Sequence, residues 1–269
     1  MKLNNSDLIT FDLENKEHLT LLERTIKSNG SELISGDIKR FVERNIELNK
    51  KDNITNCYII WDDITKEAVI VDPADKEEII EKKIEELDLK VRYVLLTHAH
   101  KDHTIALKKI LDKYNVKVIA NINEKRMLCG SISDCSDVFG VEQEPTNEQE
   151  CMFLEDNQEI NIGNTTIKMI YTPGHTKGGS CYLVENSNIL ITGDTLFADC
   201  FGRCDLPSSS IEDMVYSLTK LYKNYSDLQI YPGHGTVDVK LSNTYDSVRR
   251  ILLYSFDIDI DEYLNKGEK

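Results

Sequence analysis

The stretch Thr97-His98-Ala99-His100-Lys101-Asp102-His103 contains three of the six histidines of the chain together with a carboxylate. It directly follows residues 91–96, an apolar run typical of a buried strand. On an extended segment His98 and His100 point to the same side, and Asp102 and His103 lie where the chain turns into a helical pattern. Imidazole and carboxylate groups suit Zn, Fe and Mn. The tight spacing therefore favours a transition-metal site over solvated loop histidines beside a helix cap.

Short apolar runs and helical patterns alternate around this stretch. Before it, residues 56–63 and 68–73 predict a β-hairpin, and residues 76–87 predict a charged helix. After it, residues 104–114 predict a helix and residues 117–120 predict a strand. Alternation of this kind indicates a layered α/β architecture.

The second half of the chain continues with strands. Residues 129–156 are acidic and poor in apolar periodicity, so we expect a loop or lid there. Residues 159–170 predict two strands around a Gly-Asn turn. Further short apolar runs at residues 180–184, 188–192 and 228–231 predict three more strands.

Three further side chains of metal-binding type each follow one of these predicted strands. They are His175, Asp194 and His234. Loops at the carboxyl ends of strands are where α/β folds build their sites. Taken singly, each residue is more often a capping or hydrogen-bonded residue than a ligand. Taken together, five of the six histidines follow predicted strands, which indicates one shared site.

The composition limits the classes of partner. With 269 residues and 40% hydrophobic content, the chain can bury the core of one large domain. Its net charge of -15 disfavours a nucleic-acid partner, because phosphate binding draws on clustered Lys and Arg. No apolar run approaches the roughly 20 residues of a membrane span, and the first residues lack the apolar region of a signal peptide. We therefore expect a soluble, cytoplasmic protein without a membrane partner, whose 7 scattered cysteines are reduced.

Residues 1–50 form a predicted helical extension before the main domain. Their apolar residues recur at helical spacing in two groups, the second of which spans residues 34–46. We expect two short helices there, packed on the main body or on a partner chain, and the second arrangement would provide a contact for an oligomer. Residues 51–269 form the expected α/β domain, which ends in a short helical tail with one helix near residues 242–255.

Four motifs, in this order, resemble those of the metallo-β-lactamase superfamily. They are the stretch from Thr97 to His103, then Thr172-Pro173-Gly174-His175-Thr176, Gly193-Asp194-Thr195-Leu196-Phe197 and Pro232-Gly233-His234-Gly235. The resemblance implies an αβ/βα four-layer sandwich with metals at the edge of its sheets. Within the superfamily, the third motif followed by Gly202-Arg203-Cys204-Asp205-Leu206-Pro207 is similar to the glyoxalase II branch, the hydroxyacylglutathione hydrolases and their shorter bacterial relatives.

The resemblance also implies a site for two divalent metal ions. One ion would be held by His98, His100 and His175, the other by Asp102, His103 and His234, and Asp194 would bridge the two. Zinc is the first expectation, with iron and manganese as alternatives that accept the same ligands. Two such ions can share one water and lower its pKa from about 16 toward 7, which gives hydroxide at neutral pH. Asp102 can accept the proton of that water or orient it, so Asp102 is the expected catalytic residue.

The expected activity is metal-dependent hydrolysis of a small acyl thioester, most simply S-lactoylglutathione. A thiolate departs as an anion, so this reaction fits a site without a separate acid. Hydrolysis of a lactone or another ester is an alternative, and so is a persulfide dioxygenase whose single iron is held by His98, His175 and Asp194. Recognition of glutathione stays open, because full glyoxalase II enzymes carry a long C-terminal extension, whereas residues 236–269 alone follow His234 here.

Overall fold

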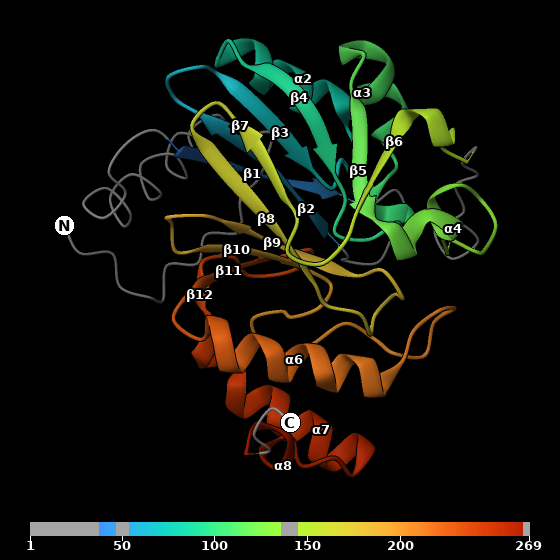
Figure 1. Cartoon of the computed structure of the whole chain (residues 1–269), viewed down its shortest axis with the longest axis vertical. Coiled ribbons are helices and arrows are strands. Elements are labelled where there is room, and N and C mark those ends of the chain that lie inside the picture. Colours follow the sequence, from blue (N-terminus) through green and yellow to red (C-terminus); the bar gives the residue numbers. More distant parts are fainter. Residues whose placement is uncertain (1–37, 47–53, 136–144, 266–269) are drawn as a thin grey trace. The chain divides into compact units, whose positions relative to one another are not determined.

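Two six-stranded β-sheets lie face to face in the computed structural model, which describes residues 38–46, 54–135 and 145–265 (Figure 1). The first sheet has the strand order β1-β2-β3-β4-β5-β6, and the second has the order β12-β11-β10-β9-β8-β7. The strands of the first sheet are β1 Ile38–Ile46, β2 Ile54–Asp62, β3 Glu67–Val71, β4 Lys90–Leu95, β5 Lys117–Asn121 and β6 Cys151–Leu154. Those of the second are β7 Glu159–Ile162, β8 Thr165–Tyr171, β9 Ser180–Val184, β10 Ile189–Gly193, β11 Gln229–Pro232 and β12 Val239–Lys240.

Helices cover the outer faces of both sheets (Figure 1). The helices α2 (Glu77–Glu86) and α3 (Leu107–Tyr114) lie over the first sheet, and α6 (Ile211–Tyr225), α7 (Tyr245–Phe256) and α8 (Ile260–Leu264) lie beyond the second. The connections contain α4 Lys125–Leu128 and the short 3-10 helices η1 Lys101–His103, η2 Ile122–Glu124, η3 Glu148–Glu150 and η4 Leu241–Thr244. This order of helix, sheet, sheet and helix layers confirms the predicted αβ/βα four-layer sandwich.

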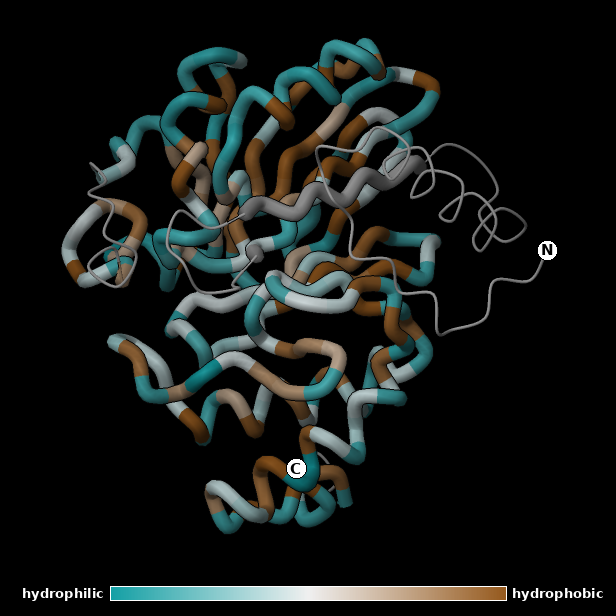
Figure 2. The backbone as a smooth tube through the Cα atoms, turned by 180° about the vertical axis from the view of Figure 1, so that it is seen from behind, coloured by the Kyte–Doolittle hydropathy of each residue, from teal (hydrophilic) through white to brown (hydrophobic). Residues whose placement is uncertain are grey.

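Hydrophobic clusters on both faces of the second sheet join it to the neighbouring layers. The core between the sheets includes Ile60, Val69, Ile167, Met169 and Tyr182. The core between the second sheet and its helices includes Ile170, Leu190, Met214, Leu218 and Leu252. Because successive side chains of a strand point to opposite faces, β8 contributes Ile167 and Met169 to the first core and Ile170 to the second. Figure 2 shows the hydrophobic residues of the chain gathered in the interior of the layers, with hydrophilic residues mainly on the outer segments.

The helix α6 also supports a loop that carries a predicted ligand. Ser210 caps its first turn by accepting a hydrogen bond from the backbone N of Asp213 at 3.1 Å. The backbone N of Ser210 donates to the carbonyl of Gly174 at 2.8 Å, and the hydroxyl of Ser217 donates to the carbonyl of Pro173 at 2.6 Å. The helix is thereby attached to the two residues before His175.

The helical prediction for the N-terminal extension is wrong where the structure describes it. Residues 1–37 and 47–53, which include the first expected helix, lie outside the described residues. Residues 38–46 form the strand β1, which pairs antiparallel with β2 from Ile38 opposite Asp62 to Ile46 opposite Ile54. Backbone pairing over 9 residues with β2 overrides the helical spacing of the apolar residues.

The predicted loop at residues 129–156 is also wrong in part. Residues 136–144 lie outside the described residues, but Cys151–Leu154 form the strand β6, parallel to β5 at the edge of the first sheet. The expected C-terminal helix is confirmed as α7, and α8 follows it. All 7 cysteines lie in the described residues as free thiols. Among the helices of these residues, none combines the length and apolar character needed to cross a bilayer.

Candidate metal centre

The first four predicted ligands follow strand β4. This strand ends at Leu95, and His100 keeps an extended backbone before η1 turns the chain. The single turn of η1 places Asp102 and His103 beside the two histidines before it, because a 3-10 helix advances only about 2.0 Å per residue. The side chains of His98, His100, Asp102 and His103 are all buried.

The structure brings all seven predicted side chains together. His175, Asp194 and His234 follow the strands β8, β10 and β11 of the second sheet. The ligand atoms of three groups lie within 4.8 Å of one another: His98 with His100 and His175, Asp102 with His103 and His234, and His98 with His103 and Asp194. The first two groups are the two sets that the sequence resemblance implied.

The carboxylate of Asp194 lies between these two sets. Its Oδ2 is 3.5 Å from Nε2 of His175 and 3.3 Å from Nε2 of His234, and its Oδ1 is 3.3 Å from Nε2 of His103. Asp102 lies on one side only, with Oδ2 at 3.2 Å from Nε2 of His234 and 3.6 Å from Nε2 of His103. Asp194 is therefore the carboxylate with the geometry to bridge two ions.

The residues present fit divalent metal ions. Nε2 of His98 and Nε2 of His100 are buried, and neither makes a hydrogen bond within the described structure. Such atoms cost free energy unless they bind a partner. Burial, followed by the neighbouring His103, holds the pKa of His98 well below its usual value, and burial with His175 lowers the pKa of His100 to about 3. Both imidazoles are therefore neutral at pH 7, which is the form that binds zinc and similar ions.

The set of Asp102, His103 and His234 differs from the first set because the pKa values of its histidines are raised rather than lowered. Burial alone would lower the pKa of His103, but Asp102 and Asp194 raise it well above its usual value. Burial is likewise opposed at His234, whose pKa is raised to about 10 by Asp194 and Asp102. Burial would raise the pKa of Asp194, yet His234 and His103 hold it well below the usual range. In the metal-free protein, protons on His103 and His234 balance the negative charges of Asp102 and Asp194. A metal ion that binds here displaces these protons and supplies the positive charge in their place.

Asp72 orients the predicted ligand His103 and was not among the predicted site residues. Asp72 is fully buried after β3, and its Oδ2 lies 3.0 Å from Nδ1 of His103. Its Oδ1 accepts the backbone N of Thr97 at 2.8 Å, and its Oδ2 accepts the hydroxyl of Thr97 at 2.7 Å. A carboxylate on Nδ1 fixes the tautomer that presents Nε2 to a metal. Its position in the sequence could have indicated this role, because Asp72 directly follows an apolar run, as the predicted ligands do.

The start of β2 supports Asp102 and the loop of His234. The hydroxyl of Thr55 donates to Oδ2 of Asp102 at 3.2 Å. The backbone N of Asn56 donates to the carbonyl of Gly233 at 2.6 Å, and its side-chain amide donates to the carbonyl of Pro232 at 2.9 Å. These bonds hold the two segments at one edge of the sandwich.

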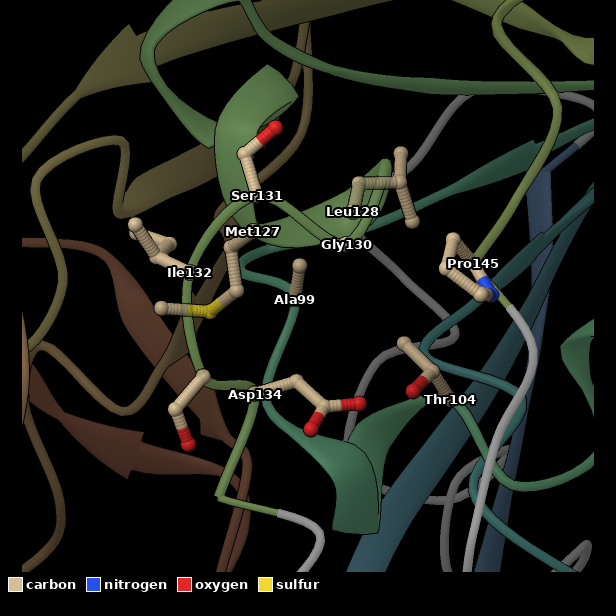
Figure 3. Close-up of a pocket in the computed structure, with 10 residues that line it drawn as sticks. Ala99, Thr104, Met127, Leu128, Gly130, Ser131, Ile132, Asp134 and Pro145 are labelled. Atoms are coloured by element: carbon tan, nitrogen blue, oxygen red, sulfur yellow. The ribbon is translucent and has the colours of Figure 1, made fainter.

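A cavity of about 370 Å³ lies beside the loop that carries His98 to His103, but none of the seven predicted ligand side chains lines it. Its wall includes Ala99, Thr104, Met127, Ile132 and Pro145 (Figure 3). Ala99 lies between His98 and His100 in an extended segment, so its side chain points away from theirs. The cavity is therefore separate from the cluster of ligand atoms.

Known proteins that are similar to this chain in sequence or in structure agree on one family. The model of the metallo-beta-lactamase superfamily matches residues 51–234. Hydroxyacylglutathione hydrolase GloC of Haemophilus influenzae is 31% identical over 182 residues, which cover 67% of this chain and 85% of the relative. The probable polyketide biosynthesis zinc-dependent hydrolase PksB of Bacillus subtilis is 32% identical over 179 residues, covering 66% and 72%. The crystal structure of ETHE1 from Myxococcus xanthus superposes with a TM-score of 0.63 at 23% identity, covering 86% and 92%. The chain therefore belongs to the metallo-β-lactamase superfamily.

Proposed function

We propose that this metallo-hydrolase cleaves small acyl thioesters with two divalent ions. One observation carries the proposal, the convergence of seven side chains into two sets with a carboxylate between them. We assign His98, His100 and His175 to one ion, Asp102, His103 and His234 to the other, and Asp194 to both. Zinc is the ion we propose first, because a histidine-rich set with carboxylates suits it and because the relative PksB is named as zinc-dependent.

The chain's own residues prepare the site for hydrolysis. When bound, two such ions would lower the pKa of a shared water and polarise the substrate carbonyl. Asp72 keeps Nε2 of His103 turned toward the cluster, and Asp194 faces both sets and so fixes their separation. Because buried hydrogen bonds hold His103 to Asp72 and Asp102 to Thr55, little reorganisation of these two groups is needed during the reaction.

Asp102 is the proposed proton acceptor. Burial would raise its pKa, but His103 and His234 lower it, so Asp102 is ionised at neutral pH. Its Oδ2 is engaged by the hydroxyl of Thr55 and lies beside His234. Oδ1 is therefore the atom that would accept the proton of the attacking water.

A thioester suits this arrangement better than an oxygen ester. The water oxygen bonds to the carbonyl carbon, the C–S bond breaks, and the electron pair leaves on sulfur while the water proton passes to Asp102 and then to solvent. Within residues 38–46, 54–135 and 145–265, the titratable side chains that converge here are all assigned as ligands, so none of them is left to protonate a leaving group. A thiol has a pKa of about 8.5, and its anion leaves without an acid. The name of the relative GloC, a hydroxyacylglutathione hydrolase, supports the same substrate class.

The test compares substrates at fixed metal content. Purified protein loaded with zinc is assayed with S-lactoylglutathione, with the matching oxygen ester and with a simple lactone. We expect kcat/KM for the thioester to exceed that for either oxygen compound at least tenfold, about 1.4 kcal/mol in transition-state stabilisation. Preferred turnover of the lactone or oxygen ester would overturn the thioester assignment. Oxygen-dependent consumption of a persulfide by protein with one iron, without thioester turnover, would replace the proposal with the dioxygenase alternative.

A further inference from the structure

Glu124 is a buried carboxylate that joins two loops of the metal centre. It is the last residue of η2 and is 1% exposed. Its Oε2 accepts the backbone N of Ala99 at 3.0 Å. Its Oε1 accepts the backbone N of Gly178 at 2.9 Å and the hydroxyl of Thr176. Ala99 lies between two predicted ligands and Thr176 follows a third, so one side chain holds both segments.

We propose that Glu124 is a positioning residue that sets the separation of the loop with His98 and His100 from the loop with His175. The inference rests on the proposed assignment of these three histidines to one ion. Glu124 reaches no ligand ring directly, and it acts through the backbone on either side of the rings. Its bonds span 25 and 54 residues in sequence, and they act beside the backbone bond from the N of Ser180 to the carbonyl of Thr97 at 2.9 Å, which joins the same two segments further from the ligand rings.

The burial of this group argues for a specific role. Burial raises the pKa of Glu124, and the bonds from Thr176, Ala99 and Gly178 oppose that shift. A buried carboxylate is costly, and an apolar side chain of similar volume would avoid that cost. A carboxylate has two acceptor oxygens, so it can bind donors on the loop of Ala99 and on the loop of Gly178 at the same time, which an apolar side chain cannot do.

The second set of proposed ligands has its own supports. Asp72 holds His103, Thr55 holds Asp102, and Asn56 holds the loop of His234. Loss of Glu124 should therefore loosen one set and leave the other in place. Such selectivity separates a positioning role from a general contribution to stability.

Glu124→Gln is the sharpest substitution, because it keeps the shape and removes one acceptor. If the amide oxygen faces Thr176 and Gly178, the amide nitrogen meets the backbone N–H of Ala99. If the amide is turned the other way, its nitrogen meets the N–H of Gly178. One loop loses its bond to this side chain in either case. Thr176→Val is a milder companion, because it removes a single donor and leaves the carboxylate in place.

Asp62→Asn is a matched control. Asp62 is also fully buried, and its carboxylate accepts the backbone N of Thr65 at 2.8 Å and that of Asn164 at 3.2 Å, which joins two turns. It lies at the opposite end of β2 from Thr55, roughly 23 Å away at about 3.3 Å per residue. The control therefore removes another carboxylate that joins two turns through backbone donors, but far from the metal centre.

The experiment measures zinc stoichiometry and affinity by chelator competition, with the visible spectrum of the cobalt-substituted protein as a second readout. We expect the wild type and Asp62→Asn to bind two ions. Glu124→Gln should bind one of them about 10- to 100-fold more weakly, as is typical when outer-shell partners are lost, with an altered spectrum for that ion only. Thr176→Val should show a smaller loss at the same ion.

Three results would overturn the inference. Glu124→Gln and Thr176→Val could bind both ions as the wild type does, or Asp62→Asn could lose the same ion, which would indicate general destabilisation. A wild-type chain that binds fewer than two ions would refute the two-ion proposal itself, and the inference with it. The last result is seen in the wild type alone, so it is distinguishable from the other two.

Discussion

Replacing Asp72 with Asn should weaken metal binding at His103 while the backbone stays unchanged. Asp72 has a φ of 51°, a left-handed conformation that Asn adopts more readily than most other residues. Asn keeps one acceptor oxygen, whereas the carboxylate serves three groups, the backbone N and hydroxyl of Thr97 and Nδ1 of His103. The substitution therefore tests the carboxylate rather than the space it fills.

Either orientation of the new amide leaves a defect. With its nitrogen toward the backbone N of Thr97, two donors face each other in a buried site. With its nitrogen toward His103, Nδ1 must accept, and the ring proton moves to Nε2, which faces the cluster and then cannot bind a metal. A buried unpaired donor costs about 1–3 kcal/mol. At about 2–4 °C per kcal/mol for a domain of this size, the melting temperature of the metal-free protein should fall by about 2–12 °C.

The assay is zinc titration by calorimetry together with thermal unfolding of the metal-free protein. Outer-shell losses typically reduce metal affinity about 10- to 100-fold, and we expect a reduction in this range for one of the two ions. Asp62→Asn again serves as the control for a lost buried carboxylate. Wild-type affinity for both ions in a folded Asp72→Asn protein would refute the argument that this carboxylate sets the tautomer of His103.

The remaining predictions concern a ligand, a close contact and pH. His100→Ala should abolish turnover and lower metal content by elemental analysis, and full activity in a folded, metal-replete variant would refute the site assignment. Gly233→Ala should weaken metal binding and lower the unfolding free energy by about 1–3 kcal/mol, because the added Cβ would lie 2.2 Å from Oδ1 of Asp194 and 2.6 Å from Cε1 of His103, both of which are buried; unchanged affinity would contradict this. Burial would raise the pKa of Asp62, but hydrogen bonds from Thr65 and Asn164 lower it below 3.8, so its contribution is present above that pH and lost as pH falls through the folded value. Urea unfolding should show a stability gap between wild type and Asp62→Asn that shrinks below about pH 4, and a constant gap would be evidence against it.

The candidate site could be located from the sequence because its residues follow a simple rule. Each predicted ligand stands at the carboxyl end of a strand, and rare residue types recur there. The layered fold followed from alternation of strand and helix patterns, and the family resemblance added the order of the layers. The correct predictions therefore came from local patterns and motifs.

The supporting residues could not be predicted in the same way. Asp72 and Glu124 are single carboxylates, and each derives its role from donors 25 or more residues away. A lone Asp or Glu near a strand end has many ordinary explanations, so only the packed structure shows which donors it meets.

The errors in secondary structure also have physical causes. The apolar residues of β1 occur at helical spacing, but the strand is determined by pairing with β2, which the local sequence does not encode. The strand β6 has only 4 residues at a sheet edge, too few to show a clear alternation. Short edge strands depend on their neighbour more than on their own sequence.

The most direct test of the two-ion assignment is anomalous diffraction from crystals of the zinc-loaded protein. We expect two peaks. One should lie about 2.0–2.1 Å from Nε2 of His98, Nδ1 of His100 and Nε2 of His175, because Nδ1 of His100 is the nitrogen that lies 2.9 Å from Nε2 of His175. The other should lie at similar distances from Asp102, His103 and His234, and Asp194 should contact both. A single peak held by His98, His175 and Asp194, or peaks away from these side chains, would contradict the two-ion assignment.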